Sequence, residues 1–69
     1  MTETAFGKVE FVGTSATSIE DAVNNALARA SRDIVDLRWF EVVETRGNVD
    51  GGKVAQWQVT VKIGHRLAD

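Results

Sequence analysis

The sequence predicts an α+β fold of order β-α-β-β, with a three-stranded antiparallel sheet wrapped on one helix. Three patterns predict this fold. Apolar residues recur every three or four positions across 19–34, as in an amphipathic helix. Two later runs, 37–47 and 54–67, alternate between apolar and polar residues as strands do. The turn residues Asp50-Gly51-Gly52 join these runs, which is typical of a hairpin.

The first strand is expected at 6–12, with 13–15 ending it. Either Thr17 or Ser18 can cap the helix that follows, because each has an acidic residue three positions later that completes a capping box. The helix is expected to run to about Asp36, roughly five turns. Its apolar stripe consists of Ile19, Ala22, Val23, Ala26, Leu27, Ala30 and Ile34.

The second strand is expected at 37–47 and the third at 54–67, joined by the turn 48–52. The third strand separates its two faces cleanly. One face is apolar and carries Trp57, Val59, Val61, Ile63 and Leu67; the other is polar and carries Gln56, Gln58, Thr60, Lys62 and Arg66.

The second strand places Trp39 on the polar face of this hairpin. The apolar faces of two paired strands must coincide, so Phe40 and Val42 join the apolar stripe of the third strand. Trp39 then remains on the other face, beside Gln58 and Thr60, together with Glu41, Val43 and Thr45 of its own strand. A large aromatic beside an amide and away from the core predicts a planar ligand or another subunit.

The chain forms one domain, 1–69, without a linker or an internal repeat. A domain of this size buries only roughly 60% of its unfolded surface. One helix covers one face of the sheet, and no second layer remains for the face that carries Trp39. The long third strand also needs its edge paired or covered. We therefore expect a homo-oligomer.

Composition excludes several classes of function. The chain has no cysteine, so it has no disulfide, thiolate metal site or thiol nucleophile. Its formal net charge of −2 argues against a nucleic-acid or anionic-membrane partner. The first residues lack the basic and apolar regions of a signal peptide, and no apolar stretch approaches the roughly 20 residues that span a bilayer. We expect a cytoplasmic protein that is not an enzyme.

Four segments of the chain follow a known pattern. Val12-Gly13-Thr14-Ser15 ends the first strand, and Ala26-Leu27-Ala28-Arg29-Ala30 lies in the expected helix. The runs LRWFEVVETRG at 37–47 and QWQVTVKIG at 56–64 are specific in combination. Over nearly the whole chain, these segments resemble dodecin, the small flavin-storing protein of bacteria and archaea.

The resemblance implies a hollow homododecamer of cubic symmetry, with flavins bound in pairs at its two-fold axes. It implies that each flavin ring stacks on Trp39 and that Gln58 hydrogen-bonds the polar edge of the ring. It further implies that Arg46 and Arg66 lie near the flavin side chain or phosphate. The role that the resemblance implies is storage and light-protective quenching, with coenzyme A as a second ligand in some bacterial relatives. Arg29 and Arg32 could serve that ligand, although a solvated helix face is the better interpretation.

Physical chemistry is compatible with these roles. An indole face suits an electron-poor ring system, and stacking adds roughly 0.5–1.5 kcal/mol beyond area burial. The amide of Gln58 offers a donor and an acceptor to the flavin's pyrimidine edge. The arginines favour FMN over riboflavin because a guanidinium fork matches a phosphate.

Each of these residues also has an ordinary structural interpretation. Trp39 could be interface packing, Gln58 a solvated strand residue and Arg46 a surface charge, while Arg66 could pair with Asp69 or solvent. A shell protein without a ligand is therefore the alternative function. A nucleic-acid platform would need a second exposed aromatic and a basic surface.

Two positions do not fit the simple pattern. Strict alternation places Arg46 with Phe40 and Val42 rather than with Trp39, so a bulge or a contribution to a neighbouring pocket is required. His65 stands where dodecins usually carry phenylalanine. We expect His65 to pack on the face of Ile63, which affects local packing and acid stability rather than the flavin site.

Overall fold

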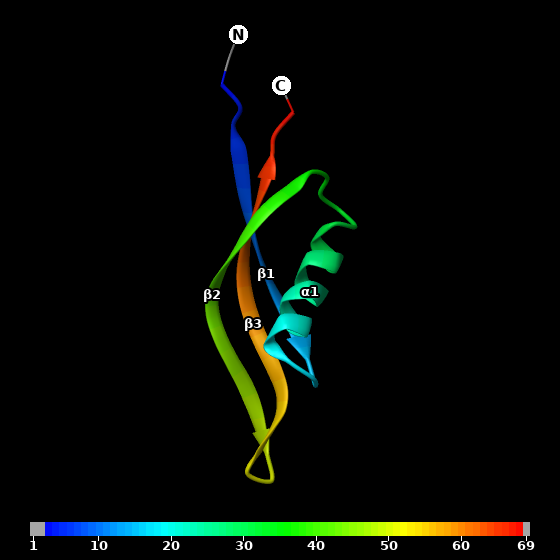
Figure 1. Ribbon diagram of the computed structural model, residues 1–69, viewed down its shortest axis with the longest axis vertical. Helices are drawn as coiled ribbons and strands as arrows, with labels where there is room; N and C mark the ends of the chain where they lie inside the picture. The colour runs from blue at the N-terminus through cyan, green and yellow to red at the C-terminus, as the bar shows by residue number, and fades with distance from the viewer. Residues whose placement is uncertain (1–2, 69) are drawn as a thin grey trace.

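The computed structural model describes residues 3–68, so positions 1, 2 and 69 of the predicted domain lie outside the described residues. The order of elements is β-α-β-β, as predicted (Figure 1). The three strands form one antiparallel sheet of order β1-β3-β2. The elements are β1 (Phe6–Ser15), α1 (Ile19–Ala30), β2 (Leu37–Asp50) and β3 (Lys53–Arg66).

The strand β3 is the centre of the sheet and pairs with β1 on one side and β2 on the other. The edges of β3, which the sequence analysis expected to be paired or covered, are both paired within the chain, and among residues 3–68 the long unpaired edge belongs to β2. The first strand is also longer than predicted, because Gly13 continues it. A Cβ at Gly13 would overlap the carbonyl oxygen of Ala22, so this glycine lets α1 approach the sheet.

The helix α1 begins after Ser18, one of the two caps that the sequence offers, and ends earlier than predicted. The Ser18 hydroxyl accepts a hydrogen bond from the backbone N–H of Asp21 at 3.0 Å, which caps the first turn. The helix ends at Ala30, after about three turns, so the predicted end near Asp36 is wrong. Ser31 follows, and its hydroxyl bonds backwards to a backbone carbonyl, which competes with a continuing helix.

The hydrophobic core lies between α1 and the inner face of the sheet, which is the face toward the helix. Its buried members are small: Ala22, Val23, Ala26 and Ala30 from α1, and Val59, Val61 and Ile63 from β3. Trp57 is partly buried and packs against this core, on the predicted side.

The helix packs on β1 and β3 and leaves the inner face of β2 open beyond Leu37, which packs against the core (Figure 1). Phe40 and Val42 do lie on the inner face, opposite Ile63 and Val61, but each is 47% exposed. The expectation that the helix covers the whole face of the sheet is therefore wrong. The apolar inner face of β2 remains available for other contacts.

The folded chain is elongated, with extents of 58 × 20 × 13 Å. Its radius of gyration is 14.4 Å, whereas a compact domain of this length has about 11 Å. Part of the excess length is the β2–β3 arm, which extends past α1 to the turn at Gly51 and Gly52 (Figure 1). Both turn glycines have positive φ, as a two-residue hairpin turn requires. This shape supports self-association.

Candidate functional site

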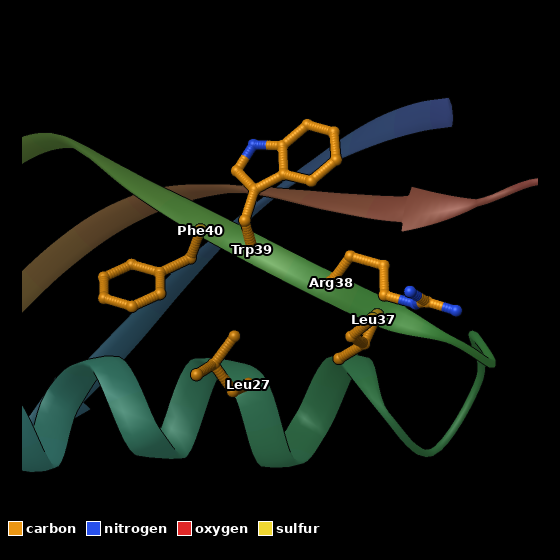
Figure 2. Close-up of a pocket in the computed structure, with 5 residues that line it drawn as sticks. All are labelled: Leu27, Leu37, Arg38, Trp39 and Phe40. Atoms are coloured by element: carbon orange, nitrogen blue, oxygen red, sulfur yellow. The ribbon is translucent and has the colours of Figure 1, made fainter. Parts of the chain in front are cut away.

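Trp39 lies on the outer face of the sheet, which is the face away from α1, as predicted. Figure 2 shows its indole on one side of β2 and Leu37 on the other side, which faces Leu27 of α1. Its partner across the strands is Gly64 of β3. The expectation that Trp39 lies beside Gln58 and Thr60 is wrong, because the hairpin register that starts from the Asp50–Lys53 pair places Gly64 opposite Trp39.

The indole of Trp39 lies flat on the backbone of Gly64. A Cβ at position 64 would overlap the fused ring system, and its nearest atoms would be Cδ2, Cε2 and Cζ2 of the indole. Gly64 therefore provides space that any other residue would fill. Trp39 remains 40% exposed. One face of the indole is thus covered by the sheet, and the opposite face is open to a ligand.

Phe6 of β1 contacts Trp39 from the far side of the central strand. The two ring centroids are 5.3 Å apart, and the planes meet at 61°, an edge-to-face arrangement. Neither Phe6 nor Gly64 was identified from the sequence as part of the site. The sequence does contain a signal for Phe6. It shares the polar side of β1 with Lys8 and is, like Trp39, a large aromatic residue outside the core.

A bulge at Val43 turns Arg46 toward the outer face. Val42 pairs with Val61 and Glu44 pairs with Thr60, so Val43 is the extra residue and the alternation reverses after it. Arg46 consequently lies opposite Gln58, on the same face of the sheet as Trp39. The bulge that Arg46 needs in order to reach this face is therefore present.

The same bulge overturns the expectation for Thr45. Simple alternation placed Thr45 on the face of Trp39, whereas the structure pairs it with Val59 on the inner face. Thr45 therefore faces the helix side of the sheet. It is not a neighbour of Trp39 on the outer face.

The candidate residues form two groups at a distance from each other. Trp39 lies opposite Gly64, whereas Arg46 lies opposite Gln58, six residues earlier on β3. Six strand residues span roughly 20 Å. A three-ring ligand centred on the indole does not reach that far. Within one chain, therefore, the aromatic platform and the predicted amide donor do not meet.

Arg66 belongs to the group around Trp39. It lies on the outer face of β3 two residues beyond Gly64, and its Nη1 is 4.0 Å from Oδ2 of Asp36. Its backbone N–H also donates to the carbonyl of Asp36 at 3.0 Å. The suggested pairing with Asp69 lies outside the described residues. Arg66 is thus held beside the start of β2, with 40% of its side chain exposed.

Asp36 connects two arginines at this end of the sheet. Arg38 donates from Nε to Oδ1 of Asp36 at 2.6 Å, and this hydrogen bond holds the pKa of the Asp36 carboxyl below its ordinary value. Asp36 adopts a left-handed conformation with φ of 62°, which an aspartate tolerates better than most residues. The charge of Asp36 therefore balances part of the positive charge beside Trp39.

Two other residues lie away from this site. His65 is on the inner face with Ile63, as expected, and its imidazole covers the backbone of Gly7. Arg29 of α1 pairs with Asp33 at 2.6 Å, which reduces its availability for a second ligand.

Two broader features are absent from residues 3–68. No group of three or more histidine, cysteine or acidic side chains is arranged there to hold a metal ion. In the same part of the chain, no helix has the length and apolar character needed to cross a membrane.

Comparisons with known proteins agree on one family. The Dodecin family profile matches residues 6–68. The curated dodecin of Thermus thermophilus is 44% identical over 64 residues, which cover 93% of each chain. The tt0972 protein from Thermus thermophilus superimposes with a TM-score of 0.94 at 42% identity, covering 97% of this chain and 98% of the other. Dodecin from Streptomyces coelicolor gives 0.93 at 43% identity, covering 100% and 99%.

Proposed function

Because this chain belongs to the dodecin family, we propose that it sequesters flavin in pairs, stacked between Trp39 side chains at two-fold interfaces of a hollow homododecamer. Dodecins are small flavin-binding proteins that bind and store their ligand rather than convert it. The proposal extends this role to quenching of flavin photochemistry, without catalysis. A cytoplasmic location is part of the same proposal.

The observation that carries the proposal is the single open face of Trp39. Gly64 covers one face of the indole, so each indole offers one platform and accepts one planar ligand. Two such platforms facing each other across a two-fold axis would hold a pair of flavins. An indole in van der Waals contact with an excited flavin can donate an electron to it, so the bound flavin should be nearly non-fluorescent.

The remaining groups support a site shared between two copies. Gln58 and Arg46 lie roughly 20 Å along β3 from Gly64, the residue beneath Trp39. We propose that a second copy supplies these groups to the flavin on the first copy's Trp39. An amide on the pyrimidine edge and a guanidinium near the side chain would then complete the site. Self-association, in this view, creates the ligand site.

FMN is the flavin we propose, with riboflavin as the alternative. The two ligands differ only in the phosphate, so their affinity ratio measures what the arginines contribute. FMN should bind more tightly at low salt, and its advantage should shrink as ionic strength rises. Arg46→Gln should weaken FMN binding and leave riboflavin affinity nearly unchanged. Equal affinities for both ligands in the wild type would show that neither Arg46 nor Arg66 reaches the phosphate.

The decisive experiment compares the two tryptophans by flavin fluorescence titration. Trp39→Ala should weaken binding at least about 2- to 12-fold, the equivalent of the stacking term, and any bound flavin should fluoresce more strongly. Trp57→Phe is the matched control, because Trp57 lies on the inner face against the core. Flavin bound to Trp57→Phe should remain nearly non-fluorescent.

The alternative, a shell protein without a ligand, gives a different result. The purified wild type would then assemble but leave flavin fluorescence unchanged at any concentration. If Trp39→Ala still bound flavin tightly and quenched its fluorescence, the flavin site would lie elsewhere in the molecule.

A further inference from the structure

We propose that Phe6 is a positioning residue for Trp39, which fixes the indole in the orientation that a planar ligand needs. This inference rests on the proposed function and concerns the same site. Phe6 and Trp39 come from the two edge strands, β1 and β2, and their rings meet above the central strand β3. The two rings therefore contact each other beside Gly64, on whose backbone the indole lies.

The restraint on Trp39 has two parts with different directions. Gly64 limits the height of the indole above the sheet, because the rings rest on its backbone. A glycine has no side chain that stops the indole from sliding or swinging in the plane of the sheet. The Phe6 ring, with its centroid 5.3 Å from that of the indole and its plane inclined by 61°, lies beside the indole and limits that motion. The open face of Trp39 is then presented in one orientation.

Phe6 is suited to this role because the fold does not need it elsewhere. It is 47% exposed and does not belong to the core cluster between α1 and the sheet. Its edge-to-face contact with Trp39 is the one pair of contacting aromatic rings among residues 3–68. Removing the ring should therefore loosen Trp39 without removing a core residue.

A loosened indole has a measurable effect on binding. A side chain that must be immobilised when a ligand arrives weakens the affinity, and a side chain that is already fixed avoids this cost. For one aromatic side chain the expected effect is about a 2- to 12-fold weaker affinity. The ligand itself need not touch Phe6.

The test uses the full chain in a Trp57→Phe background, where Trp39 is the remaining tryptophan. Phe6→Ala removes the ring, Phe6→Leu keeps apolar bulk, and Phe6→Tyr keeps the aromatic edge. Val12→Ala is the matched control, since Val12 is also on the outer face of β1 but pairs with Thr60, away from Trp39. Collisional quenching by acrylamide and near-ultraviolet circular dichroism report the state of the indole without ligand, and FMN titration reports affinity.

We expect Phe6→Ala and Phe6→Leu to make Trp39 more accessible to acrylamide, weaken its near-ultraviolet signal and lower FMN affinity about 2- to 12-fold. Phe6→Tyr should restore all three properties, and Val12→Ala should change none of them. The inference is overturned if Phe6→Leu leaves the indole signals unchanged, or if Val12→Ala weakens FMN binding as much. Absence of FMN binding by the Trp57→Phe parent would instead overturn the proposed function, and the acrylamide and dichroism measurements would still decide the role of Phe6.

Discussion

Trp39 and Gly64 act as one structural unit on the outer face of the sheet. The indole is exposed because it belongs to an edge strand, and it lies flat because the residue beneath it has no Cβ. A tryptophan above a larger residue would stand away from the sheet. The orientation of the platform is therefore decided by a glycine on the neighbouring strand.

We predict that Gly64→Ala weakens flavin binding without unfolding the chain. The backbone of Gly64 does not have positive φ, so alanine is compatible with the strand. The new methyl group would overlap the indole and force Trp39 away from its position. Fluorescence titration should show flavin affinity reduced about 2- to 12-fold, the size of the stacking term.

Lys62→Ala is the control for this substitution, because Lys62 is the preceding outer-face residue of β3 and pairs with Glu41 rather than Trp39. It should bind flavin as the wild type does. If Gly64→Ala retained full affinity and full quenching, the flat contact between Gly64 and Trp39 would not matter for the ligand.

The elements are connected by ion pairs at the end of the sheet that carries Trp39. Asp36 joins the start of β2 to the end of β3 through Arg38 and through the backbone N–H of Arg66. On the outer face, Lys8 of β1 reaches Glu41 of β2 across the central strand and lowers the pKa of that carboxyl. Lys8 and Glu41 connect the two edge strands, and Asp36 connects β2 with β3, although exposed pairs contribute little each.

We predict that the contribution of Asp36 disappears at acid pH. Its pKa in the folded chain is below the ordinary value of 3.8, so the unfolded chain binds the proton more readily. The stabilisation is then complete above about pH 4 and is lost as the pH falls through the lower value of the folded state. The difference in Tm between wild type and Asp36→Asn should be constant from about pH 8 to 5 and should close below about pH 4.

Asparagine suits this comparison because it also tolerates the left-handed conformation of position 36. The two proteins should therefore differ mainly in charge. A Tm difference that stayed constant down to about pH 3, or that widened on acidification, would contradict the assignment of this pH dependence to Asp36.

The fold of residues 3–68 leaves β2 poorly covered. All 14 residues of β2 are at least partly exposed, and no strand within residues 3–68 pairs with its outer edge. An open apolar groove of about 630 Å³ runs between α1 and β2. Monomeric proteins avoid long unpaired strand edges and large exposed apolar surfaces, because both promote association. The groove is lined by Ile19, Glu20, Val23, Asn24, Leu27, Phe40 and Val42.

We predict that this chain assembles into a closed shell of twelve copies. Twelve chains of 7.5 kDa have a mass of about 90 kDa, which light scattering or native mass spectrometry should report at micromolar concentration. Val42→Asp places a charge in the groove between α1 and β2 and should yield smaller species. Val35→Asp adds the same charge to a residue that is 82% exposed, and it should still assemble. A monomeric or dimeric wild type would contradict the prediction.

The sequence by itself determined the order of elements, the start of the helix to within one residue and the face on which Trp39 lies. Each of these depends on local periodicity or on side chains a few residues apart, such as Ser18 and Asp21. The length of α1 could not be read in this way. Ile34 continues the apolar period, but the chain leaves the helix after Ala30 to reach β2.

Only the tertiary structure decided what surrounds Trp39. The bulge at Val43 reverses which residues of β2 face the helix, and the residue types around Val43 do not predict this change. Strand pairing then brings Gly64 and Phe6, which are 58 residues apart in sequence, to the same indole. The pairing also separates Trp39 from Gln58 by roughly 20 Å within one chain. Periodicity reports the face of each residue, whereas its neighbours depend on register, which distant strands set together.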